Sequence, residues 1–323
     1  MSERFALGVD FGGTSMRVAL VSARGAGRAA VAAKRTFETK KIRHPAGFVD
    51  AVASGAKAVL AERGIARGRV MGIGLGLPGS VDSARGLVHG LPNVPGWKNV
   101  PIRRLVERRL GLRAAVENDA NAMAWGEYTF GAARGAESAL FLTLGTGVGG
   151  GLVLGKRLFR GRDFSAAEIG HVRYRAGGTL CACGARGCIE TELGNRYLVK
   201  KLLQDVRRGR AKGMERFLAK HGGAKLEAVT EAARRGNAYA RAFWAEAGTL
   251  LGDFLGGICN LLNPGRIVIG GGVAQAGSFL FGPLRASLAK NAFERAGRAR
   301  VSAARFGPDA GLIGAASLIL VKP

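Results

Sequence analysis

Three glycine clusters, each directly after an apolar run, are the feature that most constrains this chain. Glycine lets successive backbone N–H groups turn toward a ligand and approach it closely, and such groups form a cradle for anions. Three cradles at strand ends would surround a polyphosphate. Because the chain has 52 glycines in 323 residues, any single cluster could also arise by chance. The clusters are Asp10–Thr14, Gly145–Gly151 and Gly270–Gly272.

Short apolar runs alternate along the chain with segments of helical periodicity, and glycine turns follow the runs. This order predicts an α/β fold with ligands at the carboxyl ends of the strands. The expected strands are Phe5–Val9, Arg17–Val21, Val31–Glu38, Val70–Leu77, Ala114–Glu117, Ala139–Leu144 and Arg266–Ile269. The expected helices are Phe48–Glu62, Ile102–Leu110, Asn118–Phe130, Arg196–Val206, Glu227–Arg235, Ala238–Leu262 and Leu312–Val321.

The strand–turn–strand pattern that enters a glycine cluster occurs twice, near Asp10 and near Gly145. This internal echo favours two similar lobes around a cleft. A length of 323 residues agrees, because domains average about 150 residues.

Two familiar phosphate loops can be tested against the second cluster, and neither holds. Gly145, Gly147 and Gly150 satisfy G-x-G-x-x-G, but the chain continues as a strand that turns at Gly155-Lys156, where a dinucleotide site needs a helix. The run from Gly150 also approaches a P-loop, but an arginine follows Lys156 in place of Ser or Thr.

Glu117–Asn121 is the most suggestive acidic segment of the chain, at a strand-to-helix junction. The simplest interpretation is a helix N-cap, which Asn and Asp favour. The functional interpretation makes Asp119 a general base, since phosphoryl transfer needs a carboxylate to orient and deprotonate the attacking hydroxyl.

His171, Cys181, Cys183 and Cys188 form a third constellation, with the spacing H-x9-C-x-C-x4-C. One imidazole and three thiolates make a closed Cys3His set, typical of structural zinc. The alternative is a reduced, metal-free loop. Glu168 and Glu190 lie within three residues of a ligand, so a zinc-braced loop would fix their directions as hydroxyl acceptors for a polyol.

The formal charge is +26, from 49 basic and 23 acidic residues. Residues 1–162 carry 25 basic and 11 acidic groups, so the charge is spread evenly over both halves. The even spread favours a general surface bias over a specific nucleic-acid site, although weak non-specific binding stays open. The sequence offers neither a membrane span nor a signal peptide, and its cysteine cluster suits a reducing compartment, so we expect a cytoplasmic protein without membrane partners.

Together these motifs resemble the ROK family of bacterial sugar kinases and repressors, and the resemblance runs nearly end to end. The zinc cluster beside the Glu-x-Gly-His run is its most specific part. The other matching segments are Asp10–Thr14, Gly76–Asp82, Pro92–Trp97, Glu117–Asn121, Gly145–Gly151 and Ile267–Gly272.

The resemblance implies an actin-like ATPase (ribonuclease H-like) fold with MgATP and a hexose in a central cleft. The implied lobes are 1–118 with about 306–323, and 119–305 with the zinc-binding loop. Asp119 looks like the family's catalytic base, acting on the sugar 6-hydroxyl. Sugar-contacting positions are matched by Gly79 (through its backbone), Asn93, Asn118, Glu168, His171 and Glu190. Phosphate loops are matched by Asp10, Gly12, Gly13, Thr14, Gly145, Thr146 and Gly147, and the adenosine-side loop by Gly271 and Gly272.

Two departures from the family pattern lie near the implied sugar site. Ala167 stands where a glycine is common, and Leu193–Asn195 replaces a usual Ala-Ser-Gly. Because both lie near the sugar, they bear on the acceptor and not on the reaction type. Glucokinase is the first hypothesis, with N-acetylglucosamine, mannose and fructose as other acceptors. Polyphosphate is a possible alternative donor. A sugar-responsive repressor is disfavoured, because Phe5 already begins the first strand and leaves no room for a preceding DNA-binding domain. The resemblance also suggests a homodimer.

Overall fold

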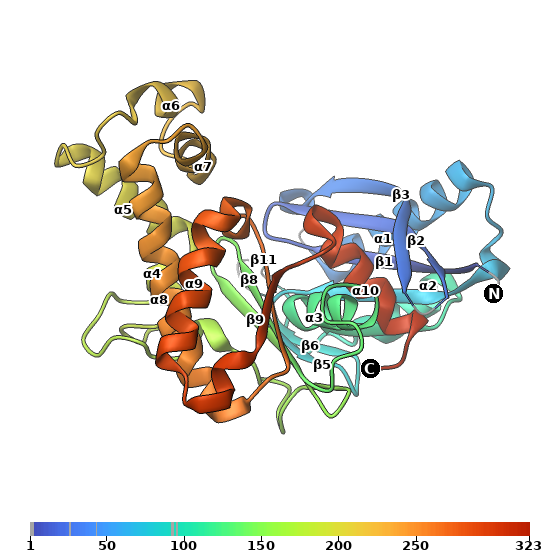
Figure 1. Ribbon diagram of the computed structural model, residues 1–323. Coiled ribbons are helices and arrows are strands. Elements are labelled where there is room, and N and C mark those ends of the chain that lie inside the picture. Colours follow the sequence, from blue (N-terminus) through green and yellow to red (C-terminus); the bar gives the residue numbers. More distant parts are fainter. Residues whose placement is uncertain (1–2, 26, 43, 92–93, 95) are drawn as a thin grey trace. The chain divides into compact units, whose positions relative to one another are not determined.

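Two five-stranded sheets of the same topology organise the chain (Figure 1). The computed structural model describes residues 3–25, 27–42, 44–91, 94 and 96–323. The first sheet has the order β3-β2-β1-β4-β7 and the second β10-β9-β8-β11-β12. In each, an antiparallel hairpin lies at one edge and a parallel pair at the other. The repeated order agrees with the internal echo of the sequence and confirms the α/β class.

Each strand and helix that the sequence predicts is present close to its expected bounds, and the structure adds others, among them the 14-residue helix Ser278–Asn291. The strands are β1 (Arg4–Phe11), β2 (Ser15–Arg24), β3 (Arg28–Glu38), β4 (Val70–Leu77), β5 (Ser80–Asp82), β6 (Leu87–Gly90), β7 (Ala114–Asn118), β8 (Ala139–Leu144), β9 (Val148–Leu154), β10 (Arg157–Phe159), β11 (Arg266–Gly270) and β12 (Arg300–Ala303). The helices are α1 (Pro45–Arg63), α2 (Ile102–Leu110), α3 (Asp119–Thr129), α4 (Glu190–Leu193), α5 (Asn195–Arg207), α6 (Glu215–Lys220), α7 (Leu226–Arg234), α8 (Ala238–Leu262), α9 (Ser278–Asn291) and α10 (Ala310–Leu320). No helix within the described ranges combines the length and hydrophobicity needed to cross a bilayer.

The chain forms two units, each with its own internal contacts. Unit 1 comprises Met1–Phe141, Gly151–Ala167 and Ala304–Pro323, and unit 2 comprises Leu142–Gly150 and Glu168–Ala303. The lobe boundaries suggested by the sequence, 1–118 with about 306–323 against 119–305, stay a prediction.

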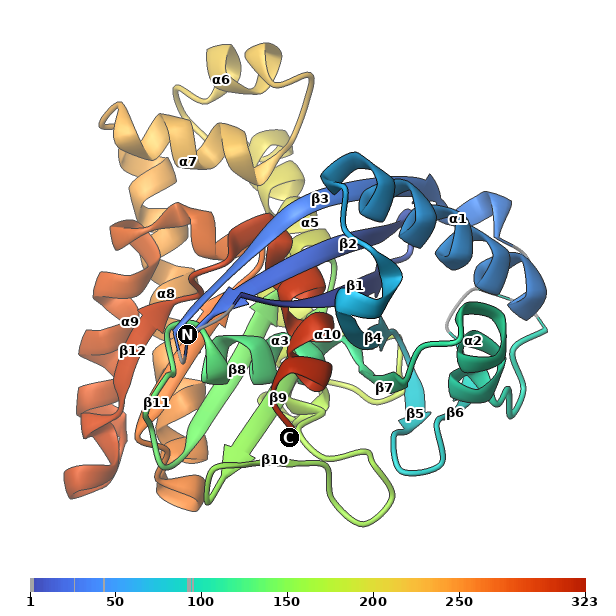
Figure 2. The same ribbon diagram turned by 90° about the vertical axis from the view of Figure 1, so that its right-hand side faces the viewer.

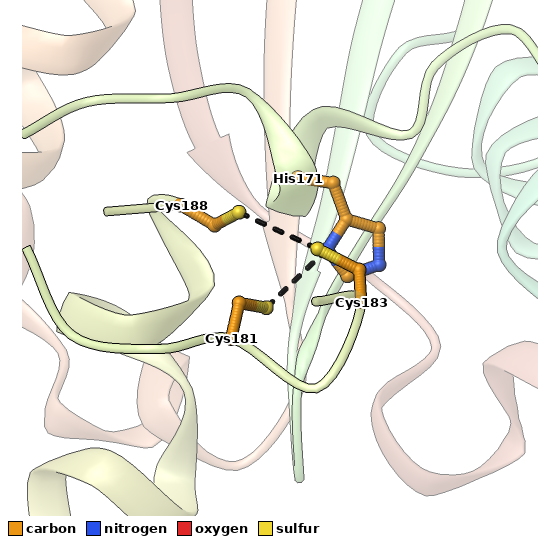
Figure 3. A group of neighbouring side chains, drawn as sticks. All are labelled: His171, Cys181, Cys183 and Cys188. Carbon is orange, nitrogen blue, oxygen red and sulfur yellow. Dashed lines mark hydrogen bonds between the residues drawn. The ribbon is translucent and has the colours of Figure 1, made fainter. Parts of the chain in front are cut away.

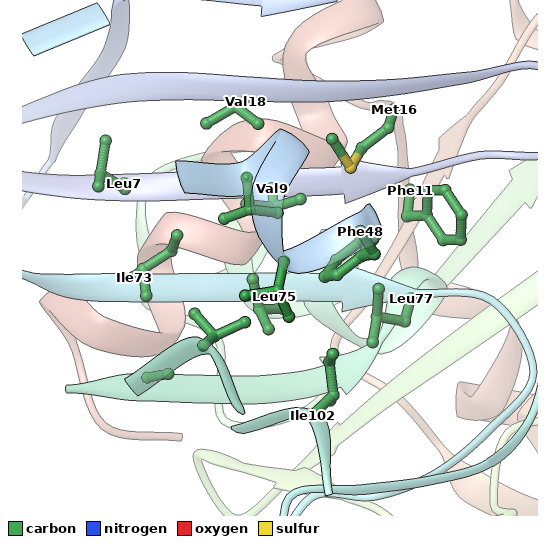
Figure 4. Packing of buried hydrophobic residues seen from close by; sticks show 14 of the residues in the cluster. Leu7, Val9, Phe11, Met16, Val18, Phe48, Ile73, Leu75, Leu77 and Ile102 are labelled. Carbon is green, nitrogen blue, oxygen red and sulfur yellow. The ribbon is translucent and has the colours of Figure 1, made fainter. Parts of the chain in front are cut away.

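The larger core of unit 1 lies on one face of its first sheet (Figure 4). Because side chains alternate across a strand, the odd-numbered residues of β1 all point to this face. Leu7, Val9 and Phe11 pack there with Phe48 of α1, and the rings of Phe11 and Phe48 meet edge to face with centroids 5.2 Å apart. The core therefore fixes β1 up to the residue that precedes the first glycine turn.

On the opposite face of the same sheet, small residues stand where a helix packs. In β4, Gly72, Gly74 and Gly76 alternate with large apolar residues. Helix α10 packs directly on Gly74 and on Gly8 of β1, so close that backbone touches backbone, whereas Gly76 lies against Ala122 of α3. Figure 2 shows α10 beside α3 and the strands of unit 1.

This contact predicts a large effect of one methyl group. A Cβ atom at Gly74 would lie 1.7 Å from the carbonyl oxygen of Ala315, so Gly74→Ala must push α10 away from the sheet. We expect a loss of about 2–4 kcal/mol in the free energy of unfolding, measured by urea denaturation. Gly47 is the matched control, because it is helical, exposed and has open space at its Cβ position. An unchanged stability in Gly74→Ala would contradict this packing.

Candidate functional site

The first glycine turn joins β1 to β2 at the end of a buried strand. The Gly12 N–H donates to the Ser15 carbonyl oxygen at 2.9 Å, which closes the turn. Thr39, the residue after β3, stabilises the turn, because its hydroxyl donates to the Gly12 carbonyl oxygen at 2.7 Å. Gly13 and Thr14 are exposed at the tip, so their backbone N–H groups are accessible to an anion, as the sequence pattern predicts.

Asp10 is held in a fixed direction below this turn. Its side chain is buried, with only 7% of the residue exposed, and it forms an ion pair with Arg17 across the β1–β2 ladder. Arg17 also donates to the Pro308 carbonyl oxygen at 2.7 Å. Gly311 of α10 lies against the carboxylate, and a Cβ atom there would come within 2.5 Å of it.

Asn118 and Asp119 lie where β7 gives way to α3, as expected. Asn118 is the N-cap: its side-chain oxygen accepts the N–H groups of Ala120 and Asn121 at 3.0 and 3.2 Å. Its amide also donates to the Gly79 carbonyl oxygen at 3.3 Å, which joins two of the predicted sugar-contacting positions. The capping interpretation therefore holds for Asn118, while Asp119 is the first residue of the helix.

Glu117, directly before these residues, is almost fully buried with 1% exposed. Its carboxylate accepts from Nε of Arg160 at 2.6 Å and from the side-chain amide of Asn121 at 3.3 Å. It also accepts the backbone N–H of Asn118 at 3.0 Å. Glu117 thus connects the segment that follows β10 to the strand end that carries Asp119.

The second glycine turn, in unit 2, is built onto the segment that follows the cysteine cluster. Glu190 is buried, and its carboxylate accepts the N–H of Val148 at 3.0 Å. The Gly145 carbonyl oxygen accepts the N–H of Asn195 at 2.9 Å. Gly147 leaves room for the Glu190 carboxylate, because a Cβ atom there would lie 2.2 Å from it and the carboxylate would have to move.

The third glycine turn lies next to the second within unit 2. Gly271 follows β11 with φ = 87°, a left-handed conformation that favours glycine. A Cβ atom at Gly271 would lie 2.3 Å from the carbonyl oxygen of Leu144, the last residue of β8. Gly271 and Gly272 are exposed, and the contact of Gly271 with Leu144 brings the third turn next to the start of the second.

His171, Cys181, Cys183 and Cys188 come together as the sequence predicts (Figure 3). Their ligand atoms all lie within 4.8 Å of one another. Sγ of Cys183 is 3.6 Å from Sγ of Cys188, and Sγ of Cys181 is 3.6 Å from Nδ1 of His171. Tetrahedral zinc with Zn–S bonds of about 2.3 Å places ligand sulfurs about 3.8 Å apart, so this set fits the ion.

The cysteines of this cluster differ in their surroundings. Desolvation, then hydrogen bonds from the neighbouring thiols, raises the pKa of Cys188 to about 12. Desolvation also raises the pKa of Cys181, while a backbone N–H from Ala185 lowers that of the exposed Cys183. Cys259 lies apart from the cluster, buried in the core-facing side of α8.

The segment Glu168–His171 packs against the start of β9. A Cβ atom at Gly170 would lie 2.0 Å from the Val148 carbonyl oxygen, so the Glu-x-Gly-His run needs its glycine here. Val148 therefore contacts both this segment and Glu190. Glu168 is exposed beside it. Asn93, the remaining predicted sugar contact, lies outside the described residues.

Three arginines of the site were not predicted from the sequence. Arg17 pairs with Asp10, Arg160 with Glu117, and Arg196 with Glu190 at 2.8 Å. Only Arg17 had a readable signal, since a tight β1–β2 hairpin places it opposite Asp10. The contacts of Arg160 with Glu117 and of Arg196 with Glu190 cannot be predicted from the spacing of these residues in the sequence.

Comparison with known proteins now decides the family. The family model described as "ROK family" matches residues 6–322. The chain belongs to the ROK family. It is 35% identical to the glucokinase of Thermotoga maritima, over 97% of this chain and 96% of the relative.

Solved structures agree on the fold. A ROK family glucokinase from Streptomyces griseus, in complex with glucose and AMPPNP, is 36% identical and superposes with a TM-score of 0.81 over 97% of this chain and 98% of that chain. A ROK family transcriptional regulator, a homologue of the E. coli MLC protein, superposes with a TM-score of 0.85 at 25% identity, over 98% of this chain and 77% of that chain. This ROK chain thus has the actin-like ATPase fold, as predicted.

The buried Glu117–Arg160 pair yields a test of the site's architecture. Arg160→Met removes the cation and leaves a buried carboxylate with its partner lost, which we expect to lower the free energy of unfolding by about 1–3 kcal/mol. Arg162→Met is the matched control, because the Arg162 side chain is 94% exposed. Equal stabilities of the two variants in urea denaturation would show that the ion pair does not support this strand end.

Proposed function

We propose that this chain is an ATP-dependent hexose kinase that phosphorylates the sugar 6-hydroxyl, with glucose as its acceptor. The observation that carries the proposal is the placement of Asp119 at a strand end, directly after a capping asparagine that also contacts Gly79. The near full-length similarity to a glucokinase supports the same acceptor.

In the proposed reaction Asp119 accepts the proton of the 6-hydroxyl. The hydroxyl oxygen then forms a bond to the γ-phosphorus of ATP while the bond to the β–γ bridging oxygen breaks, which leaves ADP and the sugar 6-phosphate. A positioned carboxylate suits this role, because phosphoryl transfer depends mainly on orientation and charge neutralisation.

The remaining sugar hydroxyls require acceptors and donors with fixed directions. We assign Asn93, Asn118, Glu168, Glu190 and His171 to this task, with Gly79 contributing its backbone. The contact between Asn118 and Gly79 and the burial of Glu190 support the assignment, because both restrict side chains that would otherwise rotate freely.

The triphosphate is assigned to the glycine turns, whose exposed N–H groups suit an anion. These are Asp10, Gly12, Gly13 and Thr14 in the first turn, Gly145, Thr146 and Gly147 in the second, and Gly271 and Gly272 on the adenosine side. Mg²⁺ bound with ATP would neutralise the charge that develops on the phosphates, and a single carboxylate such as Asp10 together with phosphate oxygens matches its usual donor set.

The cysteine cluster is assigned to one structural Zn²⁺ held by His171, Cys181, Cys183 and Cys188. When bound, the ion supplies rigidity and no chemistry to the reaction. Glu190 begins α4 two residues after Cys188, so the braced loop determines where its carboxylate points.

Several finer points rest on the family resemblance alone. They are the preference for glucose over N-acetylglucosamine, mannose or fructose, the preference for ATP over polyphosphate, and a homodimeric state. A cytoplasmic location is proposed on a different ground, because the cysteine cluster suits a reducing compartment. A coupled assay over a panel of sugars, run with ATP and with polyphosphate, tests the first two directly.

Asp119→Asn tests the assignment of the base. The amide keeps the shape of the side chain but cannot accept the proton, so we expect kcat to fall by about 10²–10⁴-fold with an unchanged Tm. Asp163→Asn is the matched control, because the Asp163 carboxylate is 83% exposed. Near-normal turnover in Asp119→Asn would remove Asp119 from the mechanism.

Metal analysis tests the zinc assignment. We expect about one zinc per chain, and its loss in Cys188→Ser, because structural sites need all four ligands. Cys259→Ala should keep the ion, since Cys259 lies outside the cluster. A preparation with no zinc and full kinase activity would refute a structural role for the metal.

A further inference from the structure

A cavity of about 720 Å³ lies within unit 1, away from the residues assigned above. It is formed where the beginning of β1, the end of α3, the β9–β10 hairpin and the end of α10 meet. Arg4 lines it, whereas Asp10 lies six residues further along β1, which corresponds to roughly 20 Å of extended chain. The volume lies in the range of small-molecule sites, about 300–1,000 Å³.

One wall of this cavity is aromatic and already fixed in place. Trp125, Tyr128 and Phe130 line it. The rings of Trp125 and Tyr128 are stacked, with centroids 5.2 Å apart and planes 26° apart. Nε1 of Trp125 donates to the Val321 carbonyl oxygen at 3.0 Å, which holds the indole, while Tyr128 is only half-buried. A flat ligand could therefore pack on Tyr128 without any rearrangement of the wall.

The remaining lining is strongly cationic. Arg4, Arg134, Lys156 and Lys322 all border the cavity, and none of its described lining residues is acidic. Four cations around one cavity attract an anion, and two of them, arginines, can bind a phosphate or carboxylate through paired N–H groups. The nearby acid Glu137 forms an exposed ion pair with Lys156 at 3.1 Å, which an anionic ligand can replace.

Lys156 occupies a backbone position that the hairpin alone does not favour. Gly155 and Lys156 form a two-residue loop between β9 and β10, both with positive φ, 53° and 64°. Hairpin loops of this kind prefer Asn-Gly or Gly-Gly, because a side chain at positive φ is strained. The lysine thus adopts a strained backbone conformation at a position where its cation borders this cavity.

We propose that this cavity binds a small aromatic anion: a planar ring that packs on Tyr128, carrying a phosphate or carboxylate group that contacts Arg134 and Lys156. The site is separate from the proposed kinase chemistry and does not depend on it. Apolar contact with the ring and charge-assisted hydrogen bonds to the anionic group are both required for binding.

Isothermal titration calorimetry of the full chain tests the proposal with four probes: phenyl phosphate, benzoate, inorganic phosphate and phenol. We expect saturable binding of phenyl phosphate and benzoate, each at least about tenfold tighter than phosphate or phenol. Tighter binding of phenyl phosphate than of benzoate would identify the anion as phosphate, and the reverse as carboxylate. The proposal would be overturned if neither phenyl phosphate nor benzoate binds, or if inorganic phosphate binds as tightly as phenyl phosphate.

Variants locate the binding in this cavity. The double variant Arg134→Ala/Lys156→Ala should weaken phenyl phosphate by about tenfold or more, since it removes two charged contacts. Tyr128→Leu should abolish the advantage of phenyl phosphate over phosphate. Arg162→Ala, an exposed cation of the same unit, should change nothing. Binding that is equal in all variants would place the ligand elsewhere and refute the site. Circular dichroism confirms that each variant is folded.

Discussion

Helix α10 lies in direct backbone contact with β1, β4 and α3, and the geometry of unit 1 depends on this contact. Gly8 and Gly74 of the sheet have no side chain, which leaves room for the backbone of α10. Gly314 of α10 likewise leaves room for the Ala122 carbonyl oxygen of α3. Interiors packed this closely do not deform gradually, so a small displacement at one point is transmitted to the rest. The position of α10 therefore fixes both the end of β1, with Asp10, and the start of α3, with Asp119.

Unit 2 is organised around a different junction. The Glu190 carboxylate accepts the N–H of Val148 at the second glycine turn and an N–H from Arg196, and it accepts the Cys181 thiol at 3.6 Å. One buried carboxylate thus connects the cysteine cluster to the turn assigned to phosphate. In the proposed function the Glu190 carboxylate also binds the sugar. The same side chain therefore contacts both the sugar and the glycine turn assigned to phosphate.

Much of this was predictable from the sequence, for physical reasons. The carboxyl ends of strands were marked by glycine clusters, and the cysteine spacing indicated the ligand set, because both depend on local chain geometry. The alternation of glycine with Ile73, Leu75 and Leu77 is visible in the sequence, and the helix over Leu312–Val321 was predicted, but the packing of that helix on the glycines was not. Arg160 was missed because its partner Glu117 comes from a distant segment, and Arg196 because the spacing does not reveal the break between α4 and α5 that lets it reach Glu190. Helix α9 was missed because Pro283 lies inside it.

The fold alone does not decide what the chain does, since a ROK transcriptional regulator shares it as closely as a ROK glucokinase does. In this account, whether Asp119 accepts a proton from the bound sugar is what separates a kinase from a regulator of the same fold. The most direct measurement is a crystal structure of the chain with glucose and AMPPNP. The account predicts the 6-hydroxyl within about 2.6–3.2 Å of the Asp119 carboxylate, with the phosphates on the glycine turns. Glucose bound with this hydroxyl turned away from Asp119, or phosphates remote from the turns, would contradict it.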